Sequence, residues 1–340
     1  MRRHKRGVTV KDVADLAGVS TATVSRVLNR HPYVAEHTRA RVMQAMKRLD
    51  YRPSHVARYL RTGVTQILGL IISDIANPYF TSIVRGIEDV AYANGYSLIL
   101  CNSDEDPARE DMYIHVLLGE QVAGVILSPS DEDSTTCTVL VEAGIPVVAV
   151  DRRLVALDVD TVLVDNVVGA YEAVSHVVGL GHRHVGLIGG PVHITTGRER
   201  REGCERALAE HGIGLDEGMI KIGDFRQKSG YEKTCELLEM DDPPTAIFVA
   251  NNLMTLGALN AIHERGLCIP CDVGVVGFDD MPWASSLNPP LTAVAQPTYD
   301  LGRVAAELLL ERLSDKERAV AEVVLQPNLI VRSSCARREP

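Results

Sequence analysis

The sequence lacks any run of apolar residues near the roughly 18 that a membrane-spanning helix needs. Its basic amino-terminal stretch leads into a helical pattern and not into the apolar core of a signal peptide. Its seven cysteines are an odd number scattered over expected helices and strands, which favours reduced thiols over a disulfide framework. We therefore expect a soluble, cytoplasmic protein with no membrane partner.

The only cysteine motif is a lone C-x-x-C pair, Cys268 and Cys271. No second pair of ligands accompanies it, and no histidine stands nearby at metal-ligand spacing. A structural zinc site normally needs four such ligands. We therefore expect no zinc site and no other metal.

The signatures of the common catalytic and cofactor sites are also missing. The sequence contains no G-x-x-x-x-G-K-[ST] phosphate loop and no G-x-S-x-G nucleophile turn. Gly179/Gly181 and Gly212/Gly214 follow expected helices, whereas a dinucleotide-binding loop follows a strand. They are interpreted as helix ends and turns. We therefore expect neither an enzyme nor a bound cofactor.

Positive charge is concentrated at the amino terminus. Residues 1–61 contain 14 Lys or Arg and 4 Asp or Glu, whereas the other 279 residues contain 21 and 41. A basic segment can neutralise DNA phosphates, while an acidic body avoids nonspecific adhesion to nucleic acid. The remaining length, with 46% hydrophobic residues overall, is ample for a buried core outside this segment.

Residues 9–30 have the pattern of two short helices around a tight turn. Thr9 and Ser20 stand at the capping positions, and Gly18 supplies the backbone freedom for the turn. Val19, Val24 and Leu28 are expected to face a small core. The outward side chains of the second helix are short or basic, which suits reading of base edges in a major groove, and are Thr21, Ala22, Thr23, Ser25, Arg26 and Asn29.

A third amphipathic helix is expected over residues 36–49, which completes a headpiece of residues 1–50. Residues 51–63 then form a linker, in which Pro53 breaks the chain, Ser54 can cap one more short helix and Gly63 ends it. The predicted buried stripe of the third helix consists of Ala40, Val42, Met43, Ala45, Met46 and Leu49.

This amino-terminal run resembles the lactose-repressor (LacI/GalR) family of bacterial transcription regulators, in which a hinge helix follows the headpiece. The resemblance implies that Ala57, Leu60 and Arg61 contact DNA, with Leu60 as an apolar wedge in the minor groove. The alternative is that Leu60 is an ordinary hydrophobic linker residue. The resemblance also implies a homodimer on a near-palindromic operator, and the base sequence of that operator stays open.

Beyond residue 63, short apolar runs alternate with helical patterns in two series, before and after about residue 164. The expected strands are residues 67–72, 97–100, 125–127, 147–150, 185–188, 246–249, 273–278, 291–295, 323–325 and 329–331. The expected helices are near residues 79–93, 107–118, 168–180, 199–210, 230–238, 254–265 and 301–313. This alternation predicts an α/β body of two doubly wound lobes, similar to periplasmic binding proteins. We expect residues 64–340 to form this effector-binding and dimerisation domain. The first lobe would hold about 64–163 plus 292–325, and the second about 164–291 plus 326–340.

Polar and aromatic side chains stand at the expected carboxyl ends of these strands, where open α/β sheets bind ligands. Carboxylates and guanidinium groups can hydrogen-bond paired hydroxyls, and aromatic rings can stack on a sugar face. Each residue alone could be structural, but together they predict an effector site made of Asn77, Tyr79, Phe80, Asp151, Arg152, Arg200, Phe225, Asn251, Asp279 and Gln296.

The resemblance is closest to repressors of the ribose-operon type, which implies a repressor controlled by ribose or a similar monosaccharide. Arg200 and Phe225 also match the purine-responsive branch, but Ile194 stands where that branch has an arginine. Asn252 stands where many relatives have aspartate, so the hydroxyl pattern of the ligand is open. A purine-type or phosphocarrier-dependent regulator is the alternative, and inducer versus corepressor is undecided, as are the regulated genes and dimer versus tetramer.

Overall fold

The computed structural model describes residues 8–28, 33–51 and 65–337. The chain divides into two compact units, Met1–Thr65 and Gln66–Pro340. Four residues predicted to contact DNA lie outside the described residues, namely Asn29, Ala57, Leu60 and Arg61. No helix in the described part of the chain is long and apolar enough to cross a membrane.

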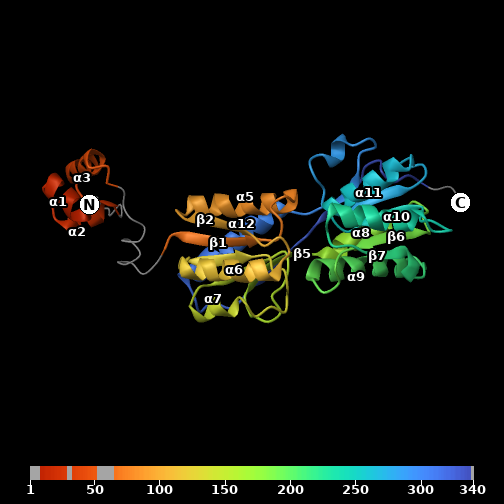
Figure 1. Ribbon diagram of the computed structural model, residues 1–340, viewed down its shortest axis with the longest axis horizontal. Helices are drawn as coiled ribbons and strands as arrows, with labels where there is room; N and C mark the ends of the chain where they lie inside the picture. The colour runs from red at the N-terminus through yellow and green to blue at the C-terminus, as the bar shows by residue number, and fades with distance from the viewer. Residues whose placement is uncertain (1–7, 29–32, 52–64, 338–340) are drawn as a thin grey trace, which may run out of the picture. The chain divides into compact units, whose positions relative to one another are not determined.

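The first unit contains, in its described residues, helices α1 (Val10–Ala17), α2 (Thr21–Leu28) and α3 (Glu36–Arg48) (Figure 1). Both predicted caps are confirmed. Thr9 and Asp12 form a capping box at α1, and the Ser20 hydroxyl accepts a hydrogen bond from the Thr23 amide at 3.1 Å. Gly18 between the helices has φ 62°, a left-handed conformation that glycine adopts without strain.

The core of this unit differs from the prediction in α3. Ala40 is exposed and Met43 is 54% exposed. Val42 and Ala45 are buried, and with the half-buried Met46 and Leu49 they repeat at helical spacing along one face, whereas Ala40 and Met43 lie off that face. The buried residues of the unit are Val13, Ala14, Ala17, Val24, Val27, Val42 and Ala45.

The Thr9 cap gives a test of the headpiece fold. Thr9→Ala removes the acceptor for the Asp12 amide and should destabilise the headpiece by about 1 kcal/mol. Thr21→Ala is the control, because this exposed side chain has no capping role and its loss should change stability by less than about 0.5 kcal/mol. Hydrogen exchange of headpiece amides in the full chain measures both, and equal effects would contradict the capping role.

The second unit contains two six-stranded sheets. The first has the order β11-β5-β4-β3-β1-β2, with every neighbouring pair parallel. Its helices are α5 (Pro78–Ala93), α6 (Pro107–Gly119), α7 (Thr138–Glu142) and α12 (Thr298–Ser314). Its strands are β1 (Ile67–Ile72), β2 (Ser97–Asn102), β3 (Gly124–Leu127), β4 (Val147–Val150), β5 (Asp160–Val164) and β11 (Glu322–Leu325).

The second sheet has the order β12-β10-β9-β8-β6-β7 and is parallel except at the β10–β12 pair. Helices α8 (Asn166–Gly179) and α9 (Thr195–Glu210) pack together, as do α10 (Gln227–Leu238) and α11 (Asn252–Glu264). The short 3-10 helices η1 (Glu217–Met219) and η2 (Ala284–Ser286) also belong to this lobe. Its strands are β6 (Val185–Gly189), β7 (Ile220–Ile222), β8 (Ala246–Val249), β9 (Gly274–Phe278), β10 (Thr292–Ala295) and β12 (Asn328–Ile330).

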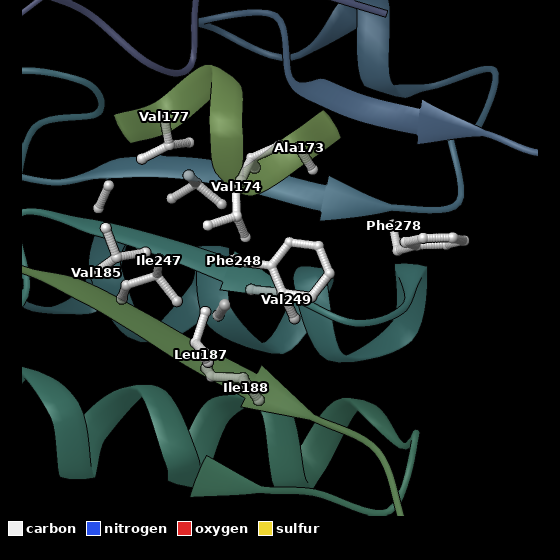
Figure 2. Close-up of a cluster of buried hydrophobic side chains, with 14 of the residues drawn as sticks. Ala173, Val174, Val177, Val185, Leu187, Ile188, Ile247, Phe248, Val249 and Phe278 are labelled. Carbon is white, nitrogen blue, oxygen red and sulfur yellow. The ribbon is translucent and has the colours of Figure 1, made fainter. Parts of the chain in front are cut away.

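Each sheet is covered by apolar side chains. Figure 2 shows this for the second lobe, where side chains of α8, β6 and β8 fill the space between helix and sheet. The central strands β6, β8 and β9 are buried along nearly their whole length, as expected when helices cover a parallel sheet. Phe248 and Phe278 are the largest of these fully buried side chains.

The chain crosses between the lobes three times, after β5, after β10 and after β11. The carboxyl-terminal part of the chain therefore returns to the first lobe as predicted, but it does so after β10 and not before it. Strand β10 pairs with β9 in the second sheet, so the assignment of residues 292–295 to the first lobe is wrong. The next helix, α12, packs against α5 in the first lobe. Short apolar runs do not reveal which of two adjacent sheets a strand joins.

Candidate effector cleft and DNA-binding face

The outward face of α2 carries short side chains and one guanidinium group. Thr21, Ala22 and Arg26 are exposed, and Thr23 and Ser25 are half-buried. The Thr23 hydroxyl lies 2.9 Å from that of Ser20, so it also takes part in the helix cap. Short side chains let a helix approach base edges closely, and an arginine can donate two hydrogen bonds to a guanine.

An arginine that the sequence analysis did not single out holds the turn in place. Arg41 of α3 donates to the carbonyl oxygens of Ala17 and Gly18, at 2.5 and 3.2 Å. These two carbonyls stand at the carboxyl end of α1, where a cation is favoured by the helix dipole. The tertiary contact of Arg41 therefore holds α3 against the carboxyl end of α1 and the turn that follows it.

A cleft between the two lobes lies at the carboxyl ends of the parallel strands. The space among its lining side chains, including the part open to solvent, is about 420 Å³. Gln296 does not line the cleft but donates a hydrogen bond to Asp279. The other nine predicted residues line it together: Asn77, Tyr79, Phe80, Asp151, Arg152, Arg200, Phe225, Asn251 and Asp279.

Four lining residues were not predicted, namely Asp74, Glu105, Thr196 and Arg226. Asp74 follows β1 and Glu105 follows β2, so the rule that places ligands at the carboxyl ends of strands could have found both. Arg226 and Thr196 stand near the starts of α10 and α9. Nothing in their local sequence marks them as cleft residues.

Two buried carboxylates face the cleft from different lobes. Asp151 directly follows β4 and Asp279 directly follows β9, and each is 5% exposed. Their φ angles are 72° and 71°, a left-handed conformation that costs a non-glycine residue energy and is enriched at functional sites. Asp151 accepts a hydrogen bond from the Tyr79 hydroxyl at 2.6 Å, and Asp279 accepts one from the Asn252 amide at 3.3 Å.

Burial raises the pKa of both carboxyl groups, because a charged group loses hydration there. Arg152 opposes this rise at Asp151, and Arg200 opposes it at Asp279. Burial, and next the charge of Asp151, raise the pKa of the Tyr79 phenol well above its usual value. Tyr79 therefore stays a hydrogen-bond donor to Asp151 at neutral pH.

The raised pKa of Asp279 predicts how the stability of the folded protein changes with pH. The folded protein binds a proton at Asp279 more readily than the unfolded chain, so ionisation of this group destabilises the fold as pH rises from about 4 through the folded pKa. Asp279→Asn, which cannot ionise, should therefore melt higher than the wild type at pH 7. The difference should shrink towards pH 4, and a pH-independent difference would contradict the assigned cause.

Two arginines of the cleft, Arg152 and Arg200, are buried and are held by several hydrogen bonds each. Arg152 donates to both carboxylate oxygens of Glu105 at 2.7 Å and to the Pro129 carbonyl oxygen at 3.0 Å. Arg200 donates to the Asn166 side chain at 2.9 Å and to the Ala250 carbonyl oxygen at 2.6 Å. Its guanidinium carbon lies 3.8 Å from the centre of the Phe278 ring. These contacts fix both guanidinium groups before any ligand arrives.

Aromatic rings form the apolar walls. Tyr79 and Phe80 meet edge to face, with ring centres 5.1 Å apart and an interplanar angle of 82°. Phe225 has φ 63°, and its ring occupies the space beside Gly190, where a Cβ atom would come within 2.0 Å of it. Flat apolar rings beside carboxylates match a ligand with hydroxyl edges and an apolar face.

The two asparagines position the loops around the cleft. Asn251 caps α11 by accepting from the Met254 amide, and its side-chain amide donates to the Phe225 carbonyl oxygen at 3.0 Å. Asn77 caps α5 and accepts from the side-chain amide of Asn252 at 2.8 Å. Asn77 and Asn252 belong to different lobes, so this hydrogen bond joins the lobes.

Ion pairs also bridge the lobes beside the cleft. Arg226 of the second lobe contacts Asp74 at 2.6 Å and Asp104 at 2.9 Å. Glu132 of the first lobe accepts hydrogen bonds from the backbone amide and hydroxyl of Thr195. The lobes are therefore linked by polar contacts that a change in their mutual arrangement would break.

The chain matches two family models. Residues 9–54 match the bacterial regulatory proteins of the lacI family, and residues 174–335 match a periplasmic binding protein-like domain. The chain is 37% identical over 330 residues to the HTH-type transcriptional repressor PurR of Haemophilus influenzae strain PittEE. The matched region covers 96% of this chain and 98% of that protein.

The chain belongs to the LacI family of bacterial transcription regulators.

Solved structures agree with this assignment. The lac repressor dimer bound to operator and the anti-inducer ONPF is 32% identical to this chain and superposes with a TM-score of 0.83. The match covers 97% of this chain and 100% of the lac repressor chain. A LacI-family regulator from Enterococcus faecium with bound ribose is 30% identical, with a TM-score of 0.73. That match covers 80% of this chain and 100% of the regulator's chain. These relatives are transcription regulators and not enzymes.

The family assignment confirms the predicted architecture, an amino-terminal helix-turn-helix unit followed by a two-lobed α/β body. This LacI-family protein is a DNA-binding transcription repressor. Repressors of this family bind operator DNA and small-molecule effectors and act as dimers.

Proposed function

We propose that this repressor binds a near-palindromic operator as a homodimer and that a neutral monosaccharide, ribose or a similar sugar, controls its affinity for DNA. The sugar would bind in the cleft between the lobes. The observation that carries the proposal is the pair of buried carboxylates, Asp151 and Asp279, which face one cleft from different lobes. A polyol has hydroxyl groups that can donate hydrogen bonds to both.

The surroundings of the two carboxylates support a sugar. Each carboxylate oxygen can accept from hydroxyl groups, and the Arg200 guanidinium can donate to them. The rings of Tyr79, Phe80 and Phe225 offer apolar faces. The family member from Enterococcus faecium carries ribose, a ligand of this chemistry.

The charges of the cleft favour a neutral ligand. Arg152 is paired with Glu105, and Arg226 is paired with Asp74 and Asp104. An anionic ligand bound at Arg152 or Arg226 would have to displace their carboxylates, and anywhere in the cleft it would lie near Asp151 and Asp279. A neutral polyol uses the existing hydrogen-bonding groups without breaking an ion pair.

A purine-type effector is the second candidate, because Arg200 and Phe225 match the purine-responsive branch and the chain resembles repressors named PurR. Ile194 argues against it. This residue precedes α9, is buried and offers no hydrogen-bonding group at the place where that branch has an arginine. A sugar does not need a donor at this position.

A thermal-shift screen of neutral monosaccharides, nucleobases and sugar phosphates tests the proposal. A ligand at 100 times its Kd should stabilise the folded state by about 2.7 kcal/mol. We expect the largest shift from ribose or another neutral monosaccharide. A shift by nucleobases with none by any sugar would overturn the sugar assignment and favour the purine-type alternative.

A further inference from the structure

We propose that Cys268 and Cys271 form a redox-active dithiol site on the second lobe, one that small-molecule disulfides such as glutathione disulfide convert to an intramolecular disulfide. This site lies outside the cleft and does not depend on the identity of the effector. The two cysteines stand in the segment between α11 and β9.

The local structure brings the two thiols together. The Cys268 carbonyl oxygen accepts from the amides of Asp272 at 2.9 Å and Val273 at 3.3 Å, and the Cys268 amide donates to the Asp272 carboxylate at 2.7 Å. These bonds fold residues 268–273 into a closed turn. Cys268 and Cys271 stand three residues apart within that turn. A C-x-x-C spacing held in this way is suited to disulfide formation.

Exposure separates this pair from every other cysteine of the chain. Cys268 and Cys271 are exposed, Cys235 is half-buried, and Cys101, Cys137, Cys204 and Cys335 are buried. Burial raises the pKa of the Cys137 and Cys335 thiols to about 12, and it also raises the pKa of Cys101 and Cys204. The buried thiols therefore form little thiolate, and the thiolate is the reactive species.

The exchange proceeds in two steps. In the first step the Cys268 thiol loses its proton to solvent, and its thiolate attacks the oxidant. That attack breaks the S–S bond of the oxidant, forms a mixed disulfide on Cys268 and releases one thiolate. Cys271 then loses its proton to solvent and attacks the Cys268 sulfur, which releases the second thiolate. Two protein thiols are oxidised, and one small disulfide is reduced to two thiols.

The test uses the full chain treated with glutathione disulfide, followed by alkylation, intact mass measurement and peptide mapping. We expect the loss of two hydrogen atoms, a disulfide mapped to Cys268 and Cys271, and reversal by dithiothreitol. Cys271→Ser should stop at a glutathione adduct on Cys268, because the second thiol is gone. Cys235→Ser is the matched control and should form the disulfide like the wild type.

Four results would overturn the proposal: no oxidation of the pair, stable glutathione adducts on both cysteines of the wild type, a disulfide between two chains, or a disulfide that uses another cysteine. Strand β9 begins near this turn and ends at the cleft beside Asp279. Because the pair and the cleft lie at opposite ends of that strand, the oxidised protein should keep the effector-induced thermal shift of the reduced protein. Failure of the dithiol proposal is thereby distinguished from failure of the effector assignment.

Discussion

Replacement of Arg200 with alanine should lower effector affinity by about 10- to 150-fold, since a hydrogen bond to a charged group contributes about 1.5–3 kcal/mol. Arg200 lines the cleft and is held rigidly between Asn166, the Ala250 carbonyl oxygen and the Phe278 ring. Operator affinity of the effector-free variant should stay at the wild-type level, because Arg200 belongs to a different compact unit from the headpiece. Calorimetric titration and DNA binding measure the two quantities.

Arg206→Ala is the matched control for this experiment. Arg206 lies on the same helix, α9, pairs with Glu210 and is largely exposed. Its loss should change neither effector affinity nor operator affinity. Arg200→Lys keeps the positive charge but not the planar guanidinium group, so its effector affinity should lie between those of the wild type and Arg200→Ala. Wild-type effector affinity in Arg200→Ala would remove Arg200 from the site.

Loss of the Asp160 carboxylate should destabilise the body by about 1–3 kcal/mol, since it leaves two partly buried guanidinium groups and a backbone amide without this acceptor. Asp160 is the first residue of β5 and is 1% exposed. It accepts hydrogen bonds from the guanidinium groups of Arg312 and Arg318, at 2.7–3.0 Å, and from the Ala321 amide at 2.9 Å. Asp160→Ala leaves both guanidinium groups without this partner.

Denaturant unfolding of the full chain, followed through the transition of the body, measures the cost. Arg85→Ala is the control, because Arg85 pairs with Asp89 on the exposed face of α5 and such pairs contribute at most about 1 kcal/mol. An Asp160→Ala variant no less stable than Arg85→Ala would show that the cluster contributes little to the fold. Asp160→Asn keeps the side-chain shape and should cost less than Asp160→Ala.

Residues with a local pattern were predicted well. Strands β1 and β8 are short, continuous apolar runs, and the structure places both at the predicted residues. The headpiece caps Thr9 and Ser20 act within three residues of their own position, so sequence spacing alone reveals them. The short elements α7, β5 and β7 were missed. Strand β7 has three residues at a sheet edge, and β5 begins with a charged residue, Asp160.

The cleft could be predicted from sequence for those residues that directly follow a parallel strand. Side chains that follow a parallel strand meet at one edge of the sheet, so Asp151 and Asp279 could be placed together from sequence. Contacts between distant residues could not be found in this way. Arg226 pairs with Asp74, which is 152 residues away, and Asp160 pairs with Arg312, also 152 residues away. No local pattern encodes such partners.

The most direct test of the account is a calorimetric titration of the protein with the best monosaccharide of the thermal-shift screen, with and without an operator fragment selected in vitro. If the sugar acts as an inducer, operator must weaken sugar binding by the factor by which sugar weakens operator binding, typically about 5- to 150-fold. We expect this weakening. Equal sugar affinities with and without operator would contradict control of DNA binding through the cleft.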